Sequence, residues 1–313
     1  MYTIGIDIGG MSIKVGVVNS NGKILLQSRV KTAPTATQCV DNMAEQIKSL
    51  LEDLNISIKD IDGIGIGCPG AVTSETGVVA FLPNLGWENV PLADMIKKYY
   101  DLPVKISNDA NVAALAEAIY GCAKNYNTSI MFTLGTGVGG GIIIDKKLFE
   151  GAYSRGAELG HVTLFLDGEP CSCGRRGCVE CYTSATALIK QTKVAMQNDK
   201  NSKMWEFVGG DLEKVDGRTA FECSKIGDES AIKVVDTYVY YLAESMLNMF
   251  NIFRPDAFIL GGGVSAQGDY LVNKLKAYCE KFDYGYKNAP RTEILVATLG
   301  NDAGIIGAAA LLK

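Results

Sequence analysis

Two stretches of the chain follow the same order of elements, and this repeat constrains the fold more than any other feature. Residues 2–30 read as a strand, a glycine-rich turn, a second strand, an Asn21-Gly22 turn and a third strand. Residues 129–150 follow the same order, again with a run of glycines in the first turn. Alternating apolar residues predict the strands, and the glycine clusters predict the turns between them. Because helical and strand patterns follow each stretch, we expect two α/β domains separated by a central cleft.

The remaining periodicity places further elements after each repeat. Helices are predicted at 40–54, 92–100, 111–123 and 229–250, and strands at 61–67, 104–107 and 257–260. We expect residues 1–107 to form a small α/β domain, completed by a C-terminal helix within 299–313, and residues 108–298 to form a large α/β domain.

The glycine-rich turns are candidate phosphate sites. Residues 135–140 match G-x-G-x-x-G, but a dinucleotide site needs a helix directly afterwards, and the next residues read as a strand. The pattern therefore disfavours hydride transfer. Glycine still lets backbone N–H groups converge on anionic oxygens, although one such turn alone is more often a plain hairpin. Three turns favour phosphate binding, and they contain Asp7 to Ser12, Thr133 to Gly141 and Gly261-Gly262-Gly263.

The only histidine of the chain stands close to three cysteines. His161, Cys171, Cys173 and Cys178 form a closed zinc set of one imidazole and three thiolates, which leaves no position for a catalytic water. We therefore expect a structural zinc loop, with Gly174 and Gly177 making its tight turns and Arg175 and Arg176 offsetting its negative charge. The alternative is ordinary buried thiols and a hydrogen-bonded histidine, which the density of ligands disfavours.

One acid stands where a strand passes into a helix. Asp109 follows the strand predicted at 104–107, and an aspartate at that place is more often a helix cap than a catalyst. The carboxyl ends of strands line the ligand crevice of α/β folds, so a catalytic role stays open. A carboxylate beside a sugar hydroxyl accepts its proton as the hydroxyl attacks a phosphoryl group.

Composition excludes several classes of protein. The net charge is −5 and no long Lys/Arg run is present, which argues against a nucleic-acid partner. Nine cysteines, several isolated in apolar segments, indicate reduced thiols and a cytoplasmic protein. Asp7 interrupts the N-terminal apolar run, which is not typical of a signal peptide, and the apolar run at 303–312 is too short to span a membrane.

These motifs, in this order and spacing, resemble the ROK family (repressor, open reading frame, kinase), and in particular its glucokinases. The motifs that carry the resemblance are Asp7-Ile8-Gly9-Gly10, Gly67-Cys68-Pro69-Gly70, Pro83-Asn84-Leu85-Gly86-Trp87, Asn108-Asp109-Ala110-Asn111, Leu134-Gly135-Thr136-Gly137-Val138-Gly139, Glu158-Leu159-Gly160-His161 and the Cys171 to Glu180 run. The resemblance implies an actin-like ATPase (ribonuclease H-like) fold of two domains that close on a sugar, and a homodimer or homotetramer. It also implies transfer of the ATP γ-phosphoryl group to a hexose, a step of carbohydrate metabolism and glycolysis.

The resemblance assigns roles residue by residue. Asp109 is expected to be the catalytic base, and the zinc ligands match the set already named. Sugar-binding positions are matched by Gly70, Asn84, Asn108, Asp109, Glu158, His161 and Glu180. ATP and Mg²⁺ are expected at Asp7, Gly9, Gly10, Ser12, Lys14, Thr133, Gly135, Thr136, Gly137, Gly261, Gly262 and Gly263.

The chain departs from the family pattern at one position, and the resemblance leaves alternative substrates and one alternative class of protein open. Met11 stands where the family usually has threonine, so we expect the Ser12 hydroxyl to take its place at the phosphate. Relatives that act on N-acetylmannosamine can carry arginine after the glycine that Gly70 matches, and Ala71 here favours D-glucose, phosphorylated on its 6-hydroxyl. The alternatives are N-acetylmannosamine, N-acetylglucosamine, mannose, fructose or a glucoside as substrate. A sugar-sensing regulator without a DNA-binding domain is the other class, and because the first strand is predicted to begin at Tyr2, we expect no DNA-binding segment before it.

Overall fold

The computed structural model describes residues 1–285, 288 and 290–313. The described chain is an α/β protein with two five-stranded sheets and one three-stranded sheet. It forms two compact units, of which the first contains Met1–Thr128, Gly141–Ala157 and Thr298–Lys313, and the second contains Ser129–Gly140 and Glu158–Ala297. No helix in this part of the chain is long and apolar enough to cross a membrane.

The first unit is built on a sheet of strand order β3-β2-β1-β4-β8. The strands β1, β2 and β3 pair antiparallel, whereas β1, β4 and β8 run parallel. A small antiparallel sheet, β5-β6-β7, follows β4 in the chain. The bounds are β1 Tyr2–Ile8, β2 Ser12–Asn19, β3 Ile24–Lys31, β4 Ile61–Cys68, β5 Ala71–Thr73, β6 Val78–Leu82, β7 Trp87–Val90, β8 Val104–Asn108, α1 Ala36–Leu54, α2 Leu92–Lys97, α3 Asp109–Ile119 and α10 Ala303–Ala310.

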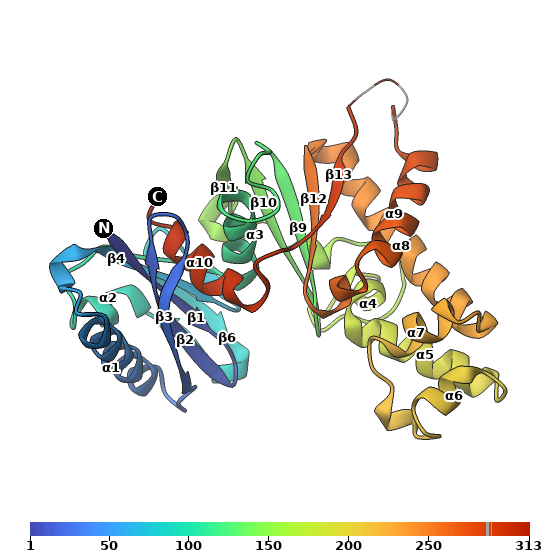
Figure 1. Cartoon of the computed structure of the whole chain (residues 1–313), viewed down its shortest axis with the longest axis horizontal. Coiled ribbons are helices and arrows are strands. Elements are labelled where there is room, and N and C mark those ends of the chain that lie inside the picture. The colour runs from blue at the N-terminus through green and yellow to red at the C-terminus, as the bar shows by residue number, and fades with distance from the viewer. Residues whose placement is uncertain (286–287, 289) are drawn as a thin grey trace. The chain divides into compact units, whose positions relative to one another are not determined.

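Strand β4 presents two different faces to its helices. Its isoleucines Ile64 and Ile66 are fully buried in the core that also contains apolar residues of α1 and α2. The other face carries glycines, and α10 lies on that side of the sheet (Figure 1). A Cβ on Gly65 would meet the Ala308 carbonyl oxygen at 1.7 Å, and one on Gly307 would meet the Val112 carbonyl oxygen at the same distance. Backbone therefore contacts backbone between β4, α10 and α3.

This packing corrects one predicted boundary. The sequence analysis placed residues 108–298 in the second domain, but α3 packs on α10 and belongs with residues 120–128 to the first unit. Residues 141–157 belong to the first unit as well. The close approach of α3 and α10 depends on Gly307, which lies against Val112 from a distant part of the sequence, so local periodicity gives no signal for it.

The second unit contains most of the sheet β11-β10-β9-β12-β13, and the boundary between the units falls within β10. The strands β9, β12 and β13 are parallel, and β10 pairs antiparallel with β11. Phe132, Phe250 and Phe258 pack edge to face between the sheet and α8. The bounds are β9 Ser129–Leu134, β10 Val138–Ile144, β11 Lys147–Phe149, β12 Ala257–Gly261, β13 Glu293–Val296, α4 Glu180–Thr183, α5 Ala185–Asn198, α6 Lys203–Phe207, α7 Thr219–Lys225, α8 Glu229–Phe253 and α9 Asp269–Phe282.

The predicted elements are largely confirmed. Each of the two repeats forms its three strands, and every predicted helix and later strand is present with ends that differ by a few residues. A strand follows the G-x-G-x-x-G run, as predicted, so the dinucleotide fold is absent at that turn.

Candidate functional site

The predicted site residues of the first unit gather where two parallel strands end. Strand β4 ends at Cys68 and β8 at Asn108, and these two residues are register partners. The Asn108 Nδ2 donates to the Gly70 carbonyl oxygen across 3.3 Å. Gly70 has a φ of +83°, and a Cβ there would meet the Phe81 carbonyl oxygen at 2.5 Å, so only glycine fits. The structure thus brings Gly70 and Asn108 together at the carboxyl edge of the sheet.

Capping of α3 is performed by Asn108 and not by Asp109. The Asn108 Oδ1 accepts from the backbone N–H groups of Ala110 at 2.9 Å and Asn111 at 3.4 Å. Asp109 is the first helical residue, and its Oδ1 accepts from the Ala110 N–H at 2.9 Å. A carboxylate in the first turn is stabilised by the helix dipole. The structural alternative for Asp109, that it serves as the N-cap, is therefore wrong.

A buried thiol lies next to this acid. Burial raises the pKa of Cys68, and the negative charge of Asp109 raises that pKa further. Cys68 is fully buried, so it stays a neutral thiol.

A glutamate that the sequence analysis missed holds the segment before Asp109. The Glu150 Oε1 accepts from Ser107 Oγ at 2.5 Å and from Ser74 Oγ at 2.7 Å. Ser107 is fully buried and stands two positions before Asp109. The Ser74 N–H also donates to Ser154 Oγ at 3.0 Å. These contacts join segments 43 to 80 positions apart, so no local sequence pattern predicts them.

Asn84, another predicted sugar residue, lies in a short 3₁₀ turn, Pro83–Leu85, between β6 and β7. Its side chain is exposed, and the turn closes on Gly86 at a φ of +64°. The next residue, Trp87, is 3% exposed and fixes the end of the turn in the core. The turn therefore presents Asn84 to solvent from a fixed base.

The first glycine turn joins β1 to β2 and is fastened by a residue that the sequence analysis did not single out. Thr32 donates from Oγ1 to the Gly9 carbonyl oxygen at 2.7 Å and from N–H to the Met11 carbonyl oxygen at 3.1 Å. Met11 itself is 88% exposed, so its side chain takes no part in the core. Thr32 thus holds the turn in place while its outer edge stays open.

Asp7 and Lys14 form an ion pair on neighbouring strands of this turn. Their atoms Oδ2 and Nζ lie 3.0 Å apart, and Lys14 also donates to the Asn301 carbonyl oxygen at 3.0 Å. Gly304 at the start of α10 lies against the Asp7 carboxylate, since a Cβ there would meet Asp7 Cγ at 2.6 Å. The predicted residues Asp7 and Lys14 are therefore in direct contact.

In the second unit, the two remaining glycine turns lie side by side. Strands β9 and β12 are parallel neighbours, with Thr133 opposite Gly261. Gly262 has a φ of +79°, and a Cβ there would meet the Leu134 carbonyl oxygen at 2.5 Å. The Gly135 carbonyl oxygen accepts from the Ala185 N–H at 2.8 Å, and Thr186 Oγ1 donates to the Thr136 carbonyl oxygen at 2.8 Å. The start of α5 therefore fixes the Thr133–Gly137 turn.

The four predicted zinc ligands form one cluster. The Nδ1 of His161 and the Sγ atoms of Cys171, Cys173 and Cys178 all lie within 4.8 Å of one another. Cys171 Sγ is 3.6 Å from His161 Nδ1, and the Cys173 and Cys178 Sγ atoms are 3.7 Å apart. Tetrahedral zinc with ordinary bond lengths gives edges of about 3.8 Å between two sulfurs and about 3.6 Å between sulfur and nitrogen. The donor set fits a zinc ion in type, number and spacing.

The loop around these ligands has the turns that the sequence predicts. Gly174 and Gly177 have φ values of +86° and +74°, and a Cβ on Gly177 would meet the Phe165 carbonyl oxygen at 1.6 Å. Arg175 donates from Nη1 to the His161 carbonyl oxygen at 3.1 Å and from Nη2 to Thr163 Oγ1 at 2.7 Å. Arg175 therefore places its positive charge within the loop, as expected.

The thiols of the cluster differ in acidity. Burial opposes ionisation of Cys171, but hydrogen bonds from the Cys173 backbone and from neighbouring side chains lower its pKa to about 7. Burial and the neighbouring thiols raise the pKa of Cys178 to about 12. Cys171 therefore ionises more readily than Cys178, and a bound cation would favour the thiolate form of Cys178.

Glu180 contacts both the metal cluster and the second glycine turn. Its Oε2 accepts from the Val138 N–H at 2.9 Å, and its Oε1 lies 3.9 Å from Cys171 Sγ. Gly137 leaves room for this carboxylate, since a Cβ there would meet Glu180 Oε2 at 2.2 Å. Gly160, beside His161, also lies close to this strand, since a Cβ there would meet the Val138 carbonyl oxygen at 2.0 Å. Glu158 is exposed at the start of the turn Leu159–His161.

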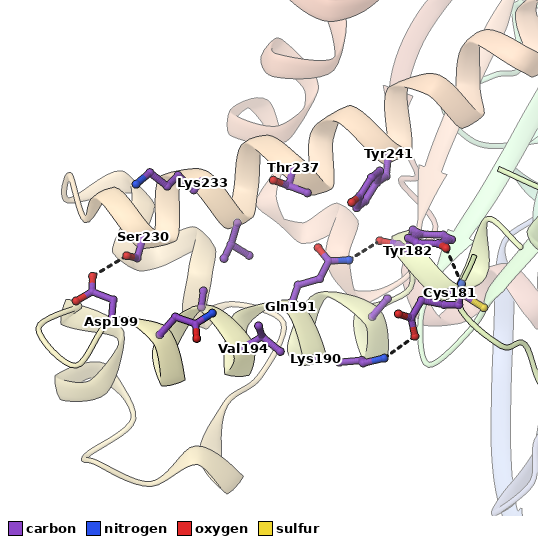
Figure 2. A pocket seen from close by; sticks show the side chains of 15 residues that line it. Cys181, Tyr182, Lys190, Gln191, Val194, Asp199, Ser230, Lys233, Thr237 and Tyr241 are labelled. Carbon is purple, nitrogen blue, oxygen red and sulfur yellow. Dashed lines mark hydrogen bonds and ion pairs between the residues drawn. The ribbon is translucent and has the colours of Figure 1, made fainter. Parts of the chain in front are cut away.

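A groove of about 740 Å³ lies elsewhere in the second unit, between α5 and α8. Figure 2 shows Gln191 and Tyr182 on one side and Tyr241 on the other. Gln191 Nε2 donates to the Tyr182 carbonyl oxygen at 3.0 Å, and Lys190 pairs with Glu169 at 2.7 Å. The groove contains none of the predicted sugar, nucleotide or metal residues, so its size does not mark the chemistry.

Similarity to known proteins identifies the family. The model of the ROK family matches residues 3–313. The chain belongs to the ROK family. It is 34% identical to the glucokinase of Halalkalibacterium halodurans over 318 residues, which cover 100% of this chain and 95% of that protein. It is 29% identical to the xylose repressor of Bacillus spizizenii over 314 residues, which cover 99% of this chain and 77% of the repressor.

A solved structure gives the same result. The ROK family glucokinase from Streptomyces griseus, in complex with glucose and AMPPNP, superposes with a TM-score of 0.82 at 34% identity. The match covers 99% of each chain. The α/β architecture is therefore that of this family.

Proposed function

We propose that this protein is an ATP-dependent sugar kinase that transfers the γ-phosphoryl group of ATP to the 6-hydroxyl of D-glucose. The observation that carries the proposal is that Asn108 caps α3, while Asp109 is the first residue of that helix. Because the Asn108 amide caps α3, the Asp109 carboxylate is not needed as a cap and stands at the carboxyl edge of two parallel strands. The full-length similarity to glucokinases supports the same activity.

Asp109 is proposed to be the general base. It accepts the proton of the 6-hydroxyl as that oxygen attacks the γ-phosphorus, which keeps the nucleophile from carrying positive charge. Positioning and neutralisation of the phosphate charge supply most of the rate, and the proton acceptor supplies about 10²- to 10⁴-fold. Ser107, held by Glu150 at 2.5 Å, fixes the backbone just before the acid.

The glycine turns are proposed to hold ATP. Gly9 and Gly10 in the first unit, and Thr133 to Gly137 with Gly261 to Gly263 in the second, offer backbone N–H groups to the phosphates. Asp7 is proposed to hold Mg²⁺ through water and Lys14 to balance its charge, with Ser12 donating a hydroxyl. Mg²⁺ supplies charge neutralisation on the phosphates when it is bound. The fold proposed for this arrangement is the two-domain actin-like ATPase.

The cysteine cluster is proposed to hold a structural zinc ion. If Nδ1 of His161 binds the metal, Nε2 is the nitrogen left for a sugar hydroxyl. Glu180, 3.9 Å from Cys171 Sγ, is then positioned by the same loop. Glu158 and Asn84 are proposed to complete the set of groups that pair with the ring hydroxyls.

Glucose is proposed over other hexoses because of the residue after Gly70. Ala71 has no donor for an N-acetyl group, and a site that pairs every hydroxyl rejects a sugar that leaves buried groups unpaired. N-acetylmannosamine, N-acetylglucosamine, mannose, fructose and glucosides are the alternative substrates. A regulator that binds sugar without turnover is the alternative class, since the chain is 29% identical to a xylose repressor.

The test is a kinase assay on the purified protein with Mg²⁺-ATP and a panel of glucose, mannose, fructose, N-acetylglucosamine and N-acetylmannosamine. We expect the highest kcat/KM with glucose and a product phosphorylated at position 6 by ³¹P NMR. A preference for another hexose overturns the assignment of glucose alone. Sugar binding without phosphoryl transfer to any sugar overturns the kinase and favours the regulator.

A further inference from the structure

Glu117 is a fully buried carboxylate that the proposed chemistry does not use. It lies in the last turns of α3, the helix that begins with Asp109. A buried ionised group is stable only where donors surround it, so its partners indicate what it is for. Its partners are four donors from two segments far apart in the sequence.

Three of these donors belong to the segment where the chain returns to the first unit. The Thr298 and Leu299 N–H groups donate to Glu117 Oε1 at 2.7 and 2.8 Å, and Thr298 Oγ1 donates to Oε2 at 3.1 Å. The Cys122 N–H donates to Oε2 at 2.9 Å. The chain passes from the second unit to the first between Ala297 and Thr298, so Glu117 binds the first two residues after that crossing.

The same helix supports a second crossing. The chain also passes between the units at Gly140 and Gly141, and Gly141 lies against the middle of α3. A Cβ on Gly141 would meet Ala114 Cβ at 2.3 Å and the Ala110 carbonyl oxygen at 3.1 Å. One helix thus carries Asp109 at its first residue, a crossing at its middle and another at its end.

The turn after α3 packs directly against the Glu117 carboxylate at Gly121. A Cβ on Gly121 would lie 1.9 Å from Glu117 Oε2, so the turn after α3 has been left bare at that point. Charge-assisted hydrogen bonds to backbone N–H groups are stronger than neutral ones and fix direction as well as distance. A leucine at position 117 would fill the space but leave the N–H groups of Cys122, Thr298 and Leu299 without this acceptor.

We propose that Glu117 is a positioning residue that fastens the crossing at Thr298 to the helix that carries Asp109. This inference rests on the proposed kinase activity. If the two units move when substrates bind, the crossings are the points at which that motion enters the first unit. A crossing held by three hydrogen bonds passes that motion to α3 as a whole, and therefore to Asp109, without local unfolding at residues 298–299. Glu117 acts through the helix and does not touch substrate.

The test uses Glu117→Gln, which keeps the volume of the side chain but replaces one acceptor oxygen by a donor group. The matched control is Ile47→Ala, in the α1 core of the same unit and away from both crossings. Hydrogen exchange is followed at the amides of Thr298 and Leu299 in the full-length protein, together with thermal unfolding and steady-state kinetics.

We expect Glu117→Gln to raise exchange at Thr298 and Leu299 at least tenfold, and to lower kcat about tenfold while KM for sugar changes less than threefold. Ile47→Ala should lower the unfolding temperature by at least as much, yet leave that exchange and kcat near the wild type. Unchanged exchange or unchanged kcat in Glu117→Gln overturns the proposal, as does an equal loss of kcat in Ile47→Ala. If the wild type phosphorylates no sugar, the proposed function fails, and the exchange experiment still decides whether Glu117 fastens the crossing.

Discussion

The Glu180 carboxylate and the Val138 backbone N–H are joined by a hydrogen bond of 2.9 Å. This bond ties the helix that follows the cysteine cluster to the glycine turn between β9 and β10. The other oxygen of Glu180 lies 3.9 Å from Cys171 Sγ. A residue predicted from sequence only as a sugar contact therefore also connects two other predicted sites within the second unit.

Replacement of one ligand should release the metal. We expect Cys173→Ser to lose zinc and to disorder the loop that ends at Glu180, because a site with three ligands binds much more weakly than one with four. The affinity for sugar should fall more than the affinity for ATP, because the Thr133–Gly137 turn keeps its hydrogen bonds to the start of α5. Metal content by mass spectrometry and binding of each substrate by calorimetry check this.

Cys181→Ser is the matched control for the metal. Cys181 lies next to the cluster, but its thiol donates to the Pro170 carbonyl oxygen, a bond that serine retains. It should keep a full zinc content. Freshly prepared wild type that holds no zinc contradicts the structural zinc site.

Removal of the proposed base should separate turnover from binding. Asp109→Asn keeps the shape of the side chain but cannot take the hydroxyl proton, so kcat should fall by about two to four orders of magnitude. The dissociation constant for sugar should change much less. Steady-state kinetics and calorimetry measure the two effects, and Asp62→Asn, at the exposed opposite end of β4, serves as the control. Near-normal turnover in Asp109→Asn would remove Asp109 from the mechanism.

The glycine face of β4 should tolerate no side chain. Gly65→Ala would place a Cβ 1.7 Å from the Ala308 carbonyl oxygen, so α10 must shift, and we expect a loss of about 3 kcal/mol or more in the free energy of unfolding. Gly217→Ala is the control, because no atom lies within 4 Å of a Cβ there, and it should change stability by less than about 0.5 kcal/mol. Urea denaturation measures both, and equal midpoints for the two variants would refute the prediction.

Sugar binding is expected to draw the two units together. Small-angle scattering at saturating D-glucose should give a smaller radius of gyration than the free protein, because the proposed sugar residues belong to both units and a shared ligand would draw the units together. L-glucose at the same concentration is the control and should leave the radius unchanged. Identical scattering with and without D-glucose would count against closure.

Local patterns were sufficient to predict most elements and the clustering of His161 with three cysteines. Strand periodicity, glycine turns and the spacing of Cys171, Cys173 and Cys178 are all short-range features, and the structure contains each of them. The contacts that fix the site are long-range. Glu150 reaches Ser107 across 43 positions and Glu117 reaches Thr298 across 181, and an isolated glutamate in a helix or loop is ordinarily a surface residue. The compact units also divide the chain at other residues than the predicted 107/108 boundary, because the packing of α3 on α10 is long-range as well.

The absence of a side chain at Gly137 bears on both the glycine turn and Glu180. Its missing side chain provides the space in which the Glu180 carboxylate sits, and in the proposed function it also leaves the turn bare for a phosphate. Any larger residue at position 137 would disturb both tasks in a single step. With the proposed roles, mutation at this position affects the sugar side and the phosphate side together, and we expect adaptation toward a new phosphoryl donor to proceed through the adjacent Thr136 instead.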